Sequence, residues 1–158
     1  MSTDLLVFRL GQQQFALPVS QVSTIVPRAT LTPLPGAPAD LIGMLRLRGA
    51  LCPVIDIRAR LGLQTAVPHI GDRIVVMHTA RFHVGLLVDK IEGLVVVANL
   101  DSIEGPAAAA RDLLIRDVRE VAGQVVATLD AELAVGNDVW AYLAATANAL
   151  HFVGQEAA

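Results

Sequence analysis

Short apolar runs, rich in β-branched residues and ended by glycine, proline or aspartate, follow one another along most of this chain. Runs of this length with such punctuation are typical of the strands of a small barrel rather than of βαβ units. Three pairs of runs predict antiparallel partners: residues 5–10 with 14–18 around Gly11, 73–78 with 83–89, and 115–121 with 125–129. The sequence therefore predicts a mainly β protein.

The segments between these pairs predict shorter elements, because proline cannot donate to a strand ladder but suits a helix start, and aspartate can cap a helix. The predicted elements are a helical turn within residues 19–26, a proline-rich connection at 32–38, a short helix at 39–42, strands at 44–49 and 50–56, a helix capped by Asp56 through Gly62, a strand at 91–100 bulged near Gly93, and a loop at 101–112 with a helical turn at Pro106.

Near the end of the chain the apolar spacing changes to that of a helix. Val139, Leu143, Ala147 and Leu150 recur at this spacing, and Asn137 or Asp138 can cap the helix. A lone helix of this length is marginal in water, so its order has to come from packing of an apolar stripe. We therefore expect Leu143, together with Trp140, to anchor a C-terminal helix on the strands.

Length and composition fit one globular domain of 158 residues. Hydrophobic residues make up 54% of the chain and charged residues 17%. Either the core is simply large, or some apolar surface remains for partners. With a net charge of −3, a single lysine at residue 90 and 4% aromatic residues, the chain lacks both the basic patch and the stacking rings of a nucleic-acid binder.

The cellular location is predicted from features that the sequence lacks. Cys52 is the only cysteine, which excludes an internal disulfide and favours a reducing compartment. Residues 1–4 have no basic signal-peptide region, and no apolar run approaches the about 18 residues of a spanning helix. We expect a cytoplasmic protein with no direct insertion in a membrane.

Candidate chemical groups are few. Cys52 precedes Pro53 in an apolar run, which predicts a neutral core thiol rather than a nucleophile. His69, His78 and His83 show no metal-ligand spacing, and neither do the nearby aspartates at 72 and 89. We therefore predict no catalytic, cofactor or metal site, with His78, His83 and Cys52 not gathered together. The alternative is a small barrel enzyme or ligand binder that uses the histidines at 78 and 83.

Residues 41–58, LIGMLRLRGALCPVIDIR, carry the most informative pattern. An apolar pair and a glycine, an Arg-Gly step, and an apolar run with proline leading to Asp-x-Arg resemble the signature of the CheW-like family. Residues 6–11, 15–22 and 84–91 resemble further segments of that family in the same order. The resemblance covers roughly residues 5 to 150.

This resemblance implies two small five-stranded SH3-like β-barrels that share a hydrophobic core, with short helices and a C-terminal helix, in one domain over residues 1–158. It also implies a non-catalytic adaptor that couples the cytoplasmic tip of a chemoreceptor to the regulatory domain of the histidine kinase CheA. Within the same family, an adaptor of a pilus or surface-sensing array is the alternative.

Partner contacts are expected at residues that the resemblance brings forward. Arg48 offers a planar fork of donors suited to a partner carboxylate, and Gly49 lets another backbone approach. An internal salt bridge for Arg48 and a turn at Gly49 are the competing interpretation. The other candidates, the last three of which can equally be buried, are Val22, Ile25, Gly85, Ile91 and Leu94.

Two positions depart from the family pattern. Arg46 stands where the family commonly has asparagine, and Thr24 stands where it often has glutamate. These changes leave the expected fold and class of function intact. They leave open which receptor and which kinase the chain serves.

Overall fold

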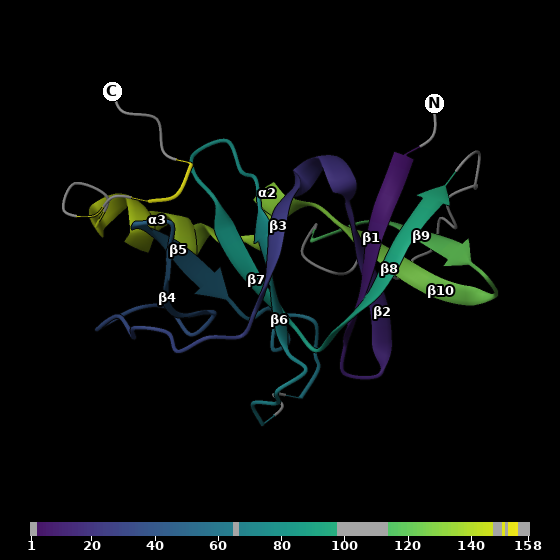
Figure 1. The fold of residues 1–158 in the computed structure, drawn as a ribbon, viewed down its shortest axis with the longest axis horizontal. Helices are drawn as coiled ribbons and strands as arrows, with labels where there is room; N and C mark the ends of the chain where they lie inside the picture. Colours follow the sequence, from purple (N-terminus) through teal and green to yellow (C-terminus); the bar gives the residue numbers. More distant parts are fainter. Residues whose placement is uncertain (1–2, 65–66, 98–113, 147–149, 151, 155–158) are drawn as a thin grey trace.

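The computed structural model describes residues 3–64, 67–97, 114–146, 150 and 152–154. Within them the chain forms two five-stranded sheets and a few short helices (Figure 1). The elements are β1 (Thr3–Leu10), β2 (Gln13–Pro18), η1 (Val19–Gln21), β3 (Val22–Pro27), β4 (Leu41–Leu47), β5 (Ala50–Ile55), β6 (Arg73–Met77), β7 (Val84–Val88), β8 (Lys90–Val97), β9 (Ile115–Val121), β10 (Gln124–Leu129), α2 (Ala131–Ala134) and α3 (Asn137–Thr146). The predicted mainly β class is confirmed.

Both sheets mix antiparallel pairs with one parallel pair. The first sheet has the order β8-β1-β2-β10-β9, and the second has the order β3-β6-β7-β5-β4. The parallel pairs are β2 with β10 and β5 with β7. In each sheet, therefore, strands that are distant in sequence lie side by side, and the predicted hairpins become parts of larger sheets.

A shared core joins the two sheets, because alternate residues of a strand face opposite sides. In β1, Leu6, Phe8 and Leu10 enter this core, whereas Leu5 and Val7 belong to a separate small cluster on the other face of the sheet. The second sheet contributes buried side chains from β4, β5, β6 and β7 to the same shared core. Burial of apolar area on this scale is the main favourable term for such a fold.

The bulge predicted near Gly93 is confirmed. The pairing of β1 with β8 shifts register between Val7 and Phe8, so that Gly93 faces Val7 and Ile91 faces Phe8. The strand itself extends to Val97 in the described residues. The predicted loop at 101–112 with its turn at Pro106 lies outside them.

Of the short helical elements predicted from local signals, the turn at 19–26 is present only in part and the helices at 39–42 and 56–62 are wrong. Of residues 19–26, only Val19–Gln21 is helical, as the 3-10 turn η1. The residues that follow form β3, because this β-branched stretch pairs with β6. Residues 39–42 are a turn followed by the start of β4, whose Leu41 pairs with Ile55. The segment from Asp56 to Gly62 is a series of turns, in which the Asp56 carboxylate accepts from the Arg58 backbone N–H at 3.0 Å.

The predicted C-terminal helix is present as α3, but Asn137 and Asp138, the residues expected to cap it, are its first two residues, and Gly136 precedes them. Val139 and Leu143 are fully buried in the shared core. Trp140 is half-buried, and its ring meets Phe82 edge-on with 5.6 Å between centroids. The anchoring by Trp140 and Leu143 is confirmed, while Ala147 lies outside the described residues.

Beyond α3 the chain returns to the second sheet, which no sequence signal predicted. Phe152 forms a parallel bridge with Leu51, and the Val153 N–H donates to the Leu51 carbonyl at 2.9 Å. The Val153 carbonyl accepts from the His83 N–H at 2.8 Å. Phe152–Gly154, here termed the C-terminal segment, thus links β5 to the start of β7.

Leu143→Ala should lower the free energy of unfolding by about 2–5 kcal/mol, because it opens a cavity in a core that α3 helps to close. Leu133→Ala is the matched control, since Leu133 is exposed at the surface. Its cost should stay within about 1 kcal/mol. Urea denaturation of the two variants measures both values, and equal losses would show that α3 does not depend on Leu143.

Candidate functional site

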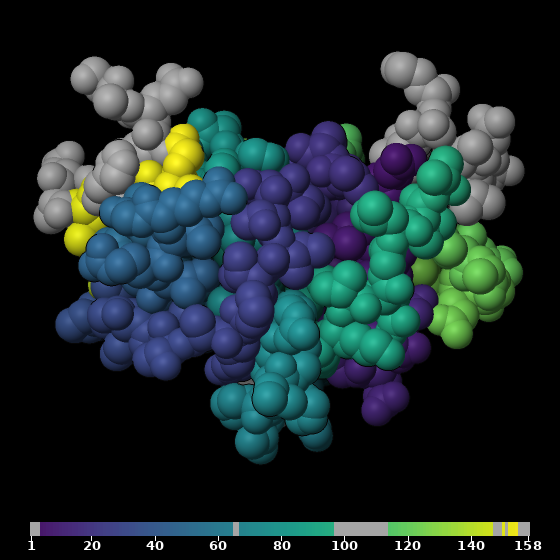
Figure 2. All heavy atoms as spheres, viewed as in Figure 1, coloured from purple at the N-terminus to yellow at the C-terminus, as the bar shows by residue number. Residues whose placement is uncertain are grey.

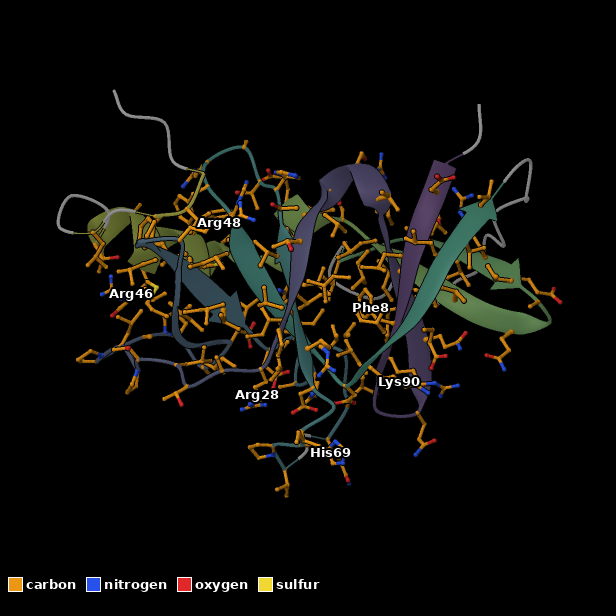
Figure 3. All side chains as sticks on the ribbon, viewed as in Figure 1. Phe8, Arg28, Arg46, Arg48, His69 and Lys90 are labelled. Atoms are coloured by element: carbon orange, nitrogen blue, oxygen red, sulfur yellow. The ribbon has the colours of Figure 1, made fainter. Side chains whose placement is uncertain are left out.

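The β4–β5 hairpin ends in a tight turn made by Arg48 and Gly49. Both residues have positive φ, 52° and 79°, as the two central residues of a type I′ turn require. Arg48 and Gly49 are exposed, and so is Arg46 on the preceding strand. Neither arginine side chain has a hydrogen bond or ion pair with any residue that the structure describes. Figure 3 labels both arginines close to β5.

A second exposed feature is apolar and lies on two edge strands. Ile25 on β3 is 38% exposed and Leu94 on β8 is 69% exposed. Their strand partners Val75 and Leu6 lie in the shared core, so both side chains occupy the core-facing side of their sheets but at its border. Figure 2 shows β3 and β8 on the same face of the molecule.

Val22 and Ile91 complete this feature. Both are half-buried and pack against the shared core. We call the set of Val22, Ile25, Ile91 and Leu94 the apolar rim. Val96, 64% exposed on β8, extends it, although the sequence analysis did not single it out.

Gly85 does not belong to any surface. It is buried in β7, and a Cβ added there would lie 2.6 Å from Ile74 Cγ2 and 3.2 Å from Val54 Cγ2. Glycine is therefore needed for close packing inside the second sheet. The expectation that Gly85 contacts a partner is corrected to this internal role.

A cavity of about 820 Å³ lies between the end of β3, β4, β7 and the loop before β6. Its charged groups are already engaged. Arg28 donates to Asp72 at 3.0 Å, and Arg58, also in the wall, donates to Asp89 at 2.5 Å. The His69 ring accepts from the Gly71 N–H at 2.8 Å. The side chains here hold loops together.

His78 and His83 are adjacent, contrary to the prediction that they would lie apart. Nδ1 of His78 is 3.0 Å from Nε2 of His83, because the loop between β6 and β7 turns back on itself. The Cys52 sulfur lies 3.8 Å from the His83 carbonyl oxygen. Burial, followed by the charges of His78 and Arg48, lowers the pKa of His83 below its ordinary value of 6.5. The described residues include no group of three or more metal-ligating side chains.

Cys52 behaves as the sequence predicted. It is fully buried in β5, and burial raises the pKa of its thiol to about 12. The thiol is therefore neutral at physiological pH and is a poor nucleophile.

A family model described as "CheW-like domain" matches residues 4–138. The chain belongs to the CheW-like family. "Chemotaxis protein CheW" of Rhizobium meliloti is 36% identical over 107 residues, which cover 68% of this chain and 69% of that protein. "Protein PilI" of Pseudomonas aeruginosa is 29% identical over 87 residues, 55% of this chain and 49% of that protein.

Among solved structures, the scaffolding protein TtCheW from Thermoanaerobacter tengcongensis superposes with a TM-score of 0.78 at 21% identity. The match covers 88% of this chain and 91% of that one. This likeness confirms the expected fold of two SH3-like barrels. No helix in the described part of the chain is long and apolar enough to cross a membrane.

Gly85→Ala should destabilise the fold by about 1–3 kcal/mol, because the added methyl group clashes inside a packed sheet. Ile74→Ala removes the nearest obstacle. The double variant should therefore lose less stability than the sum of the two single variants, as denaturant unfolding measures. Strict additivity would mean that Gly85 is not limited by Ile74.

Proposed function

We propose that this chain is a non-catalytic chemotaxis adaptor of 158 residues in one cytoplasmic domain, which couples the cytoplasmic tip of a chemoreceptor to the regulatory domain of a CheA-type histidine kinase. One observation carries the proposal: two accessible surfaces of different chemistry, the Arg48 turn and the apolar rim, are built on different elements around one shared core. An adaptor needs two such surfaces, whereas an enzyme needs one site of convergent groups.

The Arg48 turn suits a carboxylate on a partner. Its guanidinium offers several donors in a fixed plane, and no described residue uses them in a hydrogen bond or ion pair. Arg48 also holds a left-handed backbone conformation, which costs a non-glycine residue about 1–2 kcal/mol. Asparagine would suit the turn better. An arginine at this turn position, with a side chain that bonds to no described residue, points to a function for that side chain outside the fold.

The apolar rim suits an apolar partner surface. Leu94 and Ile25 stand at the borders of two sheets, where the shared core reaches solvent. Contact with a partner would extend that core by burying further apolar area. Val22 and Ile91, packed beneath, give the rim a firm base.

Chemotaxis is favoured over a pilus or surface-sensing array by the extent of the similarity. The Rhizobium meliloti protein shares more identity over a longer stretch than PilI does. Arg46 and Thr24 depart from the family pattern, and within this proposal they affect which receptor and which kinase the chain binds. Arg46 is exposed beside the Arg48 turn, and Thr24 is half-buried on β3 next to Ile25.

Arg48→Ala should weaken binding to the kinase regulatory domain or to a receptor fragment while leaving the thermal melt nearly unchanged. Loss of one side of a desolvated charge pair costs about 2–5 kcal/mol, and loss of a rim contact costs far less. Arg46→Ala, on the adjacent exposed arginine, is the matched control and should lose less. Calorimetric titration of both variants with both partners measures the difference.

Arg48→Asn separates function from stability more sharply. Asparagine favours the left-handed conformation, so this variant should be more stable by up to about 1 kcal/mol and yet bind less well. Ala122, with φ of 50° in the matching turn of β9–β10, provides the control. Ala122→Asn should gain similar stability and keep its binding. An Arg48→Asn variant that binds normally would contradict the assignment.

Leu94→Asp tests the apolar rim independently. Because Leu94 is largely exposed, its replacement should change stability by no more than about 0.5 kcal/mol. Binding to one partner should weaken by roughly 1 kcal/mol or more, about fivefold in Kd. Val125→Asp on β10 is the control, since Val125 is 62% exposed but lies outside the rim. Equal effects from both variants would argue against a specific surface.

A further inference from the structure

His78 and His83 form a bonded pair, in which His78 is exposed and His83 lies against the C-terminal segment. Their rings meet edge-on, with 4.6 Å between centroids and an interplanar angle of 82°. His78 Nδ1 and His83 Nε2 are 3.0 Å apart, so a hydrogen bond joins them when one of the two nitrogens carries a proton and the other does not. The backbone of His83 holds Val153 through its N–H, and Val153 in turn holds Leu51. The pair and the segment are therefore one connected unit.

The ring of His83 also packs against the backbone of the C-terminal segment. A Cβ added at Gly154 would lie 2.7 Å from His83 Cδ2, so the glycine backbone rests against the ring. The other ring nitrogen, Nδ1, is buried and has no hydrogen-bond partner. A neutral ring that donates from Nε2 leaves at Nδ1 only a lone pair, whereas any other protonation places an unpaired N–H there.

No described carboxylate is bonded to the pair to compensate an added positive charge. The groups that act on His83 are the His78 ring, the Arg48 guanidinium and the buried neutral thiol of Cys52. The Glu132 carboxylate accepts from the Ala80 N–H, and Arg81 lies 5.0 Å over the Trp140 ring. Residues 152–154 of the C-terminal segment carry no ionisable side chain.

We propose that the His78–His83 pair is a pH-operated latch, which holds the C-terminal segment on the edge of β5 while both rings are neutral and releases it on protonation. A first added proton either forces an N–H into the partnerless buried position or breaks the contact between the rings. A second proton places two N–H groups face to face at 3.0 Å, which the geometry does not permit.

The sign of the pH dependence follows from these contacts. Burial and then the charges of His78 and Arg48 lower the pKa of His83 in the closed state below 6.5, so the open state binds the proton more readily. The latch is fully effective above the ordinary histidine pKa and loses strength as the pH falls from there to the lower closed-state pKa. The opening equilibrium rises by up to about tenfold for each pH unit between those two values.

Hydrogen exchange of the full chain between pH 7.5 and 5 tests the latch, after correction for the intrinsic rate. The backbone amides of Val153 and His83 should lose protection as the pH falls, whereas amides in the β6–β7 ladder should not. Unchanged protection of Val153 across this range would overturn the proposal.

Variants show whether the pair is the cause. In His83→Gln the pH dependence at Val153 should disappear, and in His78→Gln it should weaken but persist, because burial still lowers the pKa of His83. In His69→Gln it should persist, because His69 lies in another loop, where its ring accepts from the Gly71 N–H. If a pair variant fails to fold, NMR titration of the wild-type rings decides, and a His83 that titrates at or above 6.5 overturns the latch.

One consequence rests on the proposed function, while the latch itself does not. Leu51, which the segment holds, is three residues from Arg48 along the hairpin, so opening should loosen the Arg48 turn. Affinity for the kinase regulatory domain should then fall with pH in the wild-type chain but stay flat in His83→Gln. Pair-dependent exchange without any binding at neutral pH would contradict the proposed function and leave the latch standing.

Discussion

The position of one sheet relative to the other depends on a buried arginine. Arg58 is 2% exposed, and it donates to Asp89 Oδ1 at 2.5 Å, with Asp56 Oδ2 at 3.6 Å. The other oxygen of Asp89 accepts from the Gly11 N–H in the β1–β2 turn, and the Asp89 N–H donates to the Arg9 carbonyl at 3.0 Å. Removing one partner of such a buried pair costs about 3–5 kcal/mol, so the shared core depends on this connection between the sheets.

The sequence stretch that contains Arg58 also shows which features could be predicted from sequence and which could not. Strands were predictable because alternation of apolar residues survives tertiary packing. The stretch from 41 to 58 resembled one family motif, yet the structure divides it. Arg48 faces solvent at a turn, whereas Asp56 and Arg58 hold loops inside the protein. Sequence spacing alone does not separate an arginine that contacts a partner from one that forms an internal ion pair, because both sites use the same charged residue types.

Long-range contacts account for the rest of what the sequence could not show. The short helices predicted at 39–42 and 56–62 gave way to strand pairing and side-chain turns. The need for glycine at position 85 comes from the side chain of Ile74 on the neighbouring strand. The histidine pair spans only five positions, but its contact depends on how the loop between β6 and β7 turns back. The pairing of Phe152 with Leu51 joins residues 101 positions apart. No local pattern reports such distances.

The composition left two interpretations open, a large core or spare apolar surface, and the structure contains both. Part of the spare surface lies on β8, a sheet-edge strand that pairs only with β1 in the described residues and exposes Leu94 and Val96. An uncovered edge with alternating exposed apolar side chains invites unwanted strand pairing. Stability of the isolated chain gains nothing from these side chains. A partner that covers β8 would prevent this unwanted pairing and would bury the exposed apolar side chains. This is the physical reason to regard the apolar rim as an interface.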